Sequence, residues 1–125
     1  MPVLATLSAI ALLRNSSQPQ PFFDPDLLRE LLADGLSDAP DDTLAESMAL
    51  AVDLKSVVER YRVSVDSGID AYINASQGPG ANKESLSRIF AVVDQERSKA
   101  LNRIVRIRQR LVDVLDEQQW KAVFG

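Results

Sequence analysis

The chain has 125 residues, contains neither cysteine nor histidine, and carries a formal net charge of −4 at pH 7. This length predicts a single domain with a modest core, and the 46% hydrophobic and 26% charged content is ordinary for a folded protein. The absence of cysteine excludes disulfides, thiol nucleophiles and thiolate metal ligands. The absence of histidine removes the commonest metal ligand and the commonest general base. The composition therefore predicts a protein that is not an enzyme and needs no cofactor.

The first expected element, residues 1–23, joins an apolar stretch to a polar linker. The stretch VLATLSAIALL, residues 3–13, is apolar on all sides. It has three interpretations: a first helix that is buried or seals a dimer, a degenerate export signal in which Ala9-Ile10-Ala11 has the small-x-small form, or the remnant of a membrane anchor. Its apolar core is short and no basic residue precedes it, which favours the helix. No apolar stretch reaches about 20 residues, so we expect no membrane-spanning segment.

Cap and turn residues along the rest of the chain predict a series of helices. Asp24-Pro25 is a typical helix start, and Gly35 is a typical stop. Thr43 and Glu46 have the spacing of a capping box, which predicts the start of a long helix. Neither alternation with a period of two nor a tight hairpin turn indicates a strand. The expected helices cover residues 24–35, 43–74, 83–114 and 117–124.

The two long helices share an apolar repeat of seven residues. The repeat is formed by Leu44, Ala51, Val58, Val65 and Tyr72 in the first, and by Leu86, Val93, Ala100, Ile107 and Val114 in the second. A Gly- and Pro-rich break at 76–82 separates the helices, so the repeat predicts an antiparallel coiled-coil hairpin. A turn centred on the break predicts the facing pairs Gly68 with Phe90, Tyr72 with Leu86, Val65 with Val93, and Tyr61 with Arg97.

The second long helix carries a further apolar line, formed by Leu101, Val105, Val112 and Leu115. One partner helix cannot cover both lines. We therefore expect this line to meet another helix or a second copy of the chain. The predicted fold class is all-α: a long antiparallel helical hairpin with additional short helices, bundle-like and completed by dimerisation into a homodimer.

Charge is distributed unevenly. Residues 1–75 hold 5 basic and 12 acidic side chains, a net −7, whereas residues 76–125 hold 9 basic and 6 acidic, a net +3. The candidate partner-binding residues are a run of six cations with no acid among them: Arg97, Lys99, Arg103, Arg106, Arg108 and Arg110. They either pair with the acidic first half or form a positive surface for an anionic or unfolded protein. Nucleic acid is disfavoured, because no aromatic residues interleave with the run and the whole chain is acidic.

The stretch VLDEQQW, residues 114–120, has the pattern of a helix start. Asp116 is the expected N-cap, and Gln119 at the third helical position completes a capping box. Leu115 before the cap and Trp120 at the fourth position have the spacing of a hydrophobic staple. These four residues therefore predict a short C-terminal helix that begins at residue 117.

The residues Leu115-Asp116-Glu117-Gln118-Gln119 resemble the LTxxQ motif, with Asp in place of the Thr cap. This motif marks the small periplasmic helical proteins of the Spy/CpxP type and related heavy-metal-resistance sensors, and the resemblance extends over residues 36–124. It implies an all-α hairpin fold, often dimeric, outside the cytoplasm. It also implies binding of unfolded protein or of an envelope-stress sensor. Metal sensing does not carry over, because those members use histidine and this chain has none.

Two functional hypotheses follow. The first is a non-enzymatic extracytoplasmic stress protein that binds an unfolded client or the domain of a stress sensor. The second is a structural interaction module, either an obligate helical dimer or a subunit of a larger assembly. The periplasm is the location that the resemblance implies, and the cytoplasm is the alternative.

Overall fold

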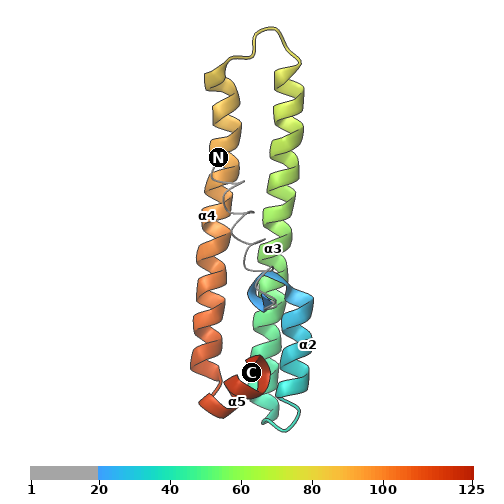
Figure 1. Cartoon of the computed structure of the whole chain (residues 1–125), viewed down its shortest axis with the longest axis vertical. Helices are drawn as coiled ribbons and strands as arrows, with labels where there is room; N and C mark the ends of the chain where they lie inside the picture. The colour runs from blue at the N-terminus through green and yellow to red at the C-terminus, as the bar shows by residue number, and fades with distance from the viewer. Residues whose placement is uncertain (1–19) are drawn as a thin grey trace. The chain divides into compact units, whose positions relative to one another are not determined.

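The computed structural model describes residues 20–125, and within this range every regular element is a helix (Figure 1). The elements are η1 (Pro21–Phe23), α2 (Pro25–Gly35), α3 (Asp41–Ser76), α4 (Lys83–Val114) and α5 (Glu117–Phe124). The predicted all-α class is confirmed for these residues. None of the helices described is long and apolar enough to cross a membrane. The interpretations of residues 3–13 lie outside the described range.

α2 is capped at both ends, and its last residue has a role that the sequence did not reveal. The Asp24 side chain accepts a hydrogen bond from the Leu27 N–H at 3.2 Å, as the N-cap pattern predicts. Gly35 ends the helix, but its backbone does not adopt the left-handed conformation of a glycine stop. A Cβ at Gly35 would lie 2.7 Å from the Cα of Val123 in α5. Glycine is therefore needed here for the close approach of α5, not for the turn.

The predicted start of the first long helix is wrong by two residues. α3 begins at Asp41, and the Leu44 N–H donates to the Pro40 carbonyl at 3.1 Å. Thr43 therefore lies inside the first turn, where it cannot act as the N-cap of a capping box. The acidic side chains of Asp41 and Asp42 in this turn favour the earlier start through the helix dipole.

α4 and α5 begin and end at the expected residues. The Asn82 side chain accepts the Ser85 N–H at 2.9 Å, and the Asn82 N–H donates to Ser85 Oγ at 3.1 Å, so this pair closes the start of α4. Asp116 accepts the Gln119 N–H at 2.8 Å, and Gln119 Oε1 accepts the Asp116 N–H at 2.9 Å. The predicted capping box at α5 is confirmed.

The described residues form two compact units. The core unit contains residues 20–58 and 102–125, and the helix-pair unit contains residues 59–101. α3 and α4 each contribute one part to both units.

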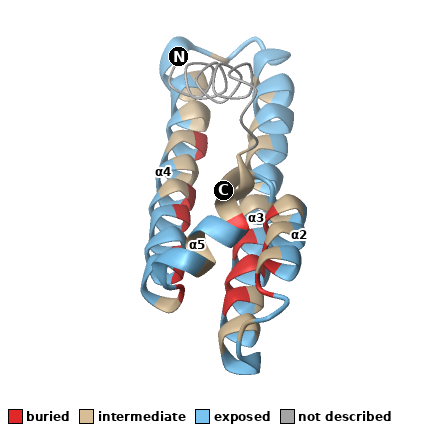
Figure 2. Ribbon diagram, turned by 60° about the horizontal axis from the view of Figure 1, so that its bottom comes forward, coloured by how far each residue is buried: buried red, intermediate tan, exposed pale blue. Residues whose placement is uncertain are grey.

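The core unit is the well-packed one. Figure 2 shows its buried positions in red along α2, the first half of α3 and the second half of α4. Leu28, Leu32, Leu54 and Leu111 are 0% exposed, and Val123 of α5 is 4% exposed. Burying a leucine side chain contributes about 1.5–3 kcal/mol, so these residues dominate the stability of the unit.

In the helix-pair unit α3 and α4 contact each other through few buried residues. A Cβ on Gly68 would clash with Val93 Cγ2, so the helices approach closely at this glycine. One turn along α3, the rings of Tyr72 and Phe90 lie 5.1 Å apart. The expected pairs of Gly68 with Phe90 and Tyr72 with Leu86 are therefore wrong by about one turn. α3 extends to Ser76, two residues further than predicted, which moves the centre of the connection along the chain.

Candidate protein-binding surfaces

Three of the six predicted cations form one row in the core unit. Arg103, Arg106 and Arg110 are spaced by three and four residues, which puts them on the same flank of α4. All three are exposed. Among residues 20–125 none of them makes an ion pair. The row, which we call the arginine row, is therefore a positive strip available to a partner.

Arg97 and Lys99 belong to the helix-pair unit and are paired there. Arg97 Nε lies 3.0 Å from Asp94 Oδ1, and Lys99 Nζ lies 3.3 Å from Glu96 Oε1. These acids are in α4 itself and not in the acidic first half of the chain. Arg97 also lies near Tyr61: burial raises the pKa of Tyr61 above its ordinary value of 10.0, Arg97 lowers this pKa, and Asp94 raises it.

Arg108 lies on the flank of α4 opposite the arginine row. Its guanidinium lies 5.4 Å from the centroid of the Trp120 ring in α5. Val105 and Val112, which are three and four residues away, share this flank and are 66% and 40% exposed. The six predicted cations therefore lie in three environments: paired with acids of α4, exposed in the arginine row, and in contact with Trp120. They are spread in this way because a helix turns each successive residue by about 100°.

A shallow depression lies between the end of α4 and α5. Its lining residues are Arg108, Val112, Leu115, Asp116, Glu117, Trp120 and Lys121. The four residues that predicted the start of α5 lie at or beside this depression. Leu115, Asp116 and Trp120 line it, and Gln119 forms with Asp116 the capping box that fixes the start of α5.

Aromatic contacts hold α5 in place. The rings of Trp120 and Phe124 lie 4.5 Å apart, and Phe124 lies 5.4 Å from Phe22 in η1. The backbone of Val123 fits against Gly35. The position of Trp120 therefore depends on contacts between segments far apart in the sequence, which a local pattern does not reveal.

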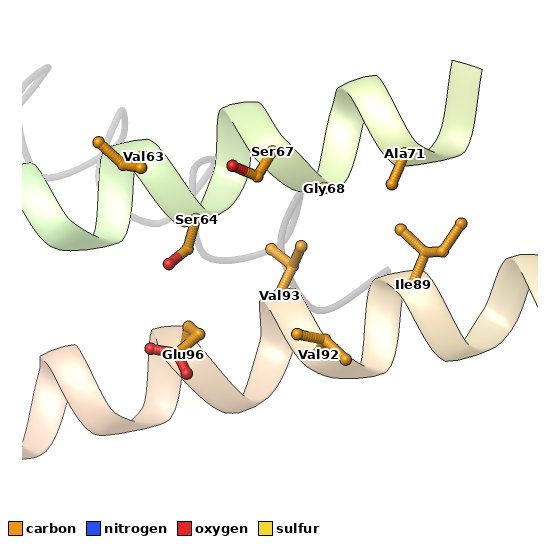
Figure 3. A pocket seen from close by; sticks show the side chains of 9 residues that line it. All are labelled: Val63, Ser64, Ser67, Gly68, Ala71, Ile89, Val92, Val93 and Glu96. Carbon is orange, nitrogen blue, oxygen red and sulfur yellow. The ribbon is translucent and has the colours of Figure 1, made fainter. Parts of the chain in front are cut away.

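The helix-pair unit has an open groove of its own (Figure 3). The residues lining it are Val63, Ser64, Ser67, Gly68 and Ala71 of α3 and Ile89, Val92, Val93 and Glu96 of α4. Val63 and Val92 are each 60% exposed. The groove is thus mostly apolar and formed by small side chains. One sequence signal points to this groove, the glycine at position 68 within an otherwise regular helix.

No group of three His, Cys, Asp or Glu side chains in the described part of the chain could hold a metal ion. No family model, curated protein or solved structure matches the chain. The resemblance to the LTxxQ family therefore rests on the motif residues themselves, and function has to be inferred from the surfaces.

Proposed function

We propose that this is a non-enzymatic, protein-binding stress protein, which acts outside the cytoplasm on an unfolded client or on a stress-sensor domain. The observation that carries the proposal is the arginine row of Arg103, Arg106 and Arg110, exposed and without an ion pair in residues 20–125. In this proposal α3 and α4 form one continuous antiparallel hairpin, and a second copy completes the fold.

Neighbouring like charges on one helix flank repel each other and weaken the helix slightly. An acidic polypeptide would remove this repulsion and would be attracted to the strip before contact. The groove of the helix-pair unit adds apolar surface for the hydrophobic side chains that an unfolded chain exposes. The arginine row suits acidic segments of a client, and the groove, taken by itself, suits apolar ones.

The direct test is suppression of aggregation of a chemically reduced, acidic client protein at low salt. We expect protection at a near-stoichiometric ratio, and a loss of protection as salt screens the charges. Arg103→Gln/Arg106→Gln/Arg110→Gln should lose most of it.

The matched control is Arg29→Gln/Lys55→Gln/Arg62→Gln, which removes three exposed cations elsewhere. It should protect like the unaltered protein. An absence of protection at low salt with excess protein would refute the proposal, and equal losses in the two triple variants would refute the role of the arginine row.

The location has its own test. Residues 1–20, fused to a reporter that is active only after export, should give an active reporter if the protein works outside the cytoplasm. An inactive reporter would count against the extracytoplasmic role and leave protein binding to be judged by the client assay.

The second candidate function is a structural interaction module. It is favoured by the exposure of Val105 and Val112 on the apolar line of α4, at 66% and 40%. If a second copy covers this line, light scattering should show a dimer at micromolar concentration. A monomer would contradict this candidate.

A further inference from the structure

We propose that the depression beside Trp120 binds a peptide segment that presents a carboxylate side chain next to an aliphatic one, with the carboxylate on Arg108. This inference rests on the proposed protein-binding function, but it uses different residues from the arginine row. It adds a second contact, of defined chemistry, on the opposite flank of α4.

Arg108 is arranged as an anion receptor. The guanidinium carbon lies over the Trp120 ring, 5.4 Å from its centroid, and this cation–π contact restrains the side chain. None of its N–H groups donates to another residue in the range 20–125, so they remain donors for a ligand. The side chain is exposed, and no acid in residues 20–125 pairs with it. A guanidinium edge of this kind binds a carboxylate through two parallel hydrogen bonds.

The acids that line the depression are engaged elsewhere. The Asp116 carboxylate accepts the Gln119 N–H at 2.8 Å, as the N-cap of α5. Glu117 Oε1 lies 3.8 Å from Lys121 Nζ, one turn along the same helix. Neither carboxylate therefore pairs with Arg108, whose guanidinium is the group in the lining that can bind a further carboxylate.

The floor of the depression is apolar. Val112 is 40% exposed, and Leu115 and Trp120 complete the surface beside it. An aliphatic side chain would bury this surface. A purely apolar ligand would remove water from Arg108 without replacing it, which is unfavourable, so the ligand needs both groups.

A nucleotide base fits less well than a peptide. Base recognition uses an open aromatic face. The indole of Trp120 is already in contact with Arg108, whose Cζ lies 5.4 Å from the ring centroid, and with Phe124, whose ring centroid lies 4.5 Å away. The capping box and the Gly35–Val123 contact also fix α5 before any ligand arrives, which lowers the entropic cost of binding.

Trp120 is the single tryptophan of the chain, so its fluorescence reports on this site alone. The probe is a blocked peptide of alternating glutamate and leucine, compared with a twin that has glutamine for glutamate. We expect the glutamate peptide to change the Trp120 emission saturably, and the twin to bind at least about tenfold more weakly. No response to the glutamate peptide, or equal affinity for the twin, would overturn the proposal.

Arg108→Gln should weaken binding of the glutamate peptide by about tenfold or more. Arg108→Lys should have an affinity between those of Arg108→Gln and the unaltered protein, because lysine keeps the charge but lacks the planar guanidinium. Arg29→Gln removes the same charge from an exposed side chain of α2 that lies outside both proposed binding surfaces, and it is the matched control, expected to bind like the unaltered protein. Equal losses in Arg108→Gln and Arg29→Gln would show that only overall charge matters, and would overturn the site.

The two proposals can fail separately. The arginine-row triple variant should lose client protection while its Trp120 emission still responds to the glutamate peptide. Client protection without a peptide response at Trp120 would reject this site and keep the proposed function. A peptide response without client protection would keep the site and reject the stress-protein role.

Discussion

The core unit and the helix-pair unit are built from the same two helices but differ in what covers them. In the core unit, α2 and α5 add to α3 and α4, and leucines such as Leu54 and Leu111 are fully buried. In the helix-pair unit only Val93 and Ala100 are buried, and Val63, Ile69 and Val92 are each more than half exposed. The comparison shows that a regular apolar repeat does not by itself make a core, since burial requires further elements.

This difference predicts unequal stability along single continuous helices. Segments with few buried apolar contacts open more often than a packed core. The helix-pair unit should therefore be the more mobile part on the timescale of hydrogen exchange, while the core unit supports the arginine row and the Arg108 site on a stable base.

The largest expected effect on stability comes from removing the side chain of a core leucine. Leu111→Ala should lower the free energy of unfolding by about 2–5 kcal/mol, because a fully buried side chain leaves a cavity. Val93→Ala in the helix-pair unit should cost less, roughly 1–2 kcal/mol, since it removes two methyl groups beside an open groove. Urea unfolding followed by Trp120 fluorescence and by circular dichroism checks both, and a larger loss for Val93→Ala would contradict the comparison.

A second substitution tests how α5 completes the core unit. Gly35→Ala places a Cβ 2.7 Å from the Val123 backbone and should cost about 1–3 kcal/mol, with a shift in the Trp120 emission as α5 moves. Gly80→Ala is the control, since a Cβ there meets nothing within 4 Å. Equal thermal stability of the two variants would mean that the close approach of α5 does not matter.

The equivalent test in the helix-pair unit is Gly68→Ala. The added Cβ meets Val93 Cγ2, so overpacking should exceed the gain in helix propensity by about 1 kcal/mol. Adding Val93→Ala should relieve the clash, whereas adding Phe90→Ala should not. Thermal unfolding of the three variants therefore distinguishes the two registers. Rescue by Val93→Ala supports the observed register, and rescue by Phe90→Ala alone would support the register expected from the sequence.

The smallest effect is a pH dependence of the helix-pair unit. Burial raises the pKa of Tyr61, so folding favours the neutral phenol. Its stabilising contribution is complete below the ordinary pKa of 10.0 and is lost as pH rises through the folded value. In a Tyr72→Phe variant, Tyr61 is the one remaining tyrosine, and its ultraviolet absorbance should titrate above 10.0. Titration at or below that value would show that burial does not dominate the environment of the phenol.

Local signals predicted the helix termini well, because caps depend on residues close in sequence. The capping box of Asp116 and Gln119 needs only four consecutive residues, and it is present as predicted. The start of α3 was missed because the Pro40 carbonyl and the acids that follow it outweigh the Thr43 pattern.

Features that depend on tertiary contacts could not be predicted in the same way. The register of the helix pair depends on how the connection between the helices is built: the prediction placed Phe90 opposite Gly68, where the structure has Val93. The run of cations was recognised, but its division into paired, exposed and stacked members was not. The contact of Arg108 with Trp120 exists only because the turn between α4 and α5 brings the two side chains together.

Hydrogen exchange of the full chain, alone and with the reduced acidic client, tests the central claim most directly. Alone, α2 and the core-unit parts of α3 and α4 should exchange slowly and residues 59–101 faster. With the client, exchange should slow further over Asn102–Val114, where the arginine row lies. Uniform protection across both units without the client, or client-induced protection confined to residues 59–101, would contradict the account.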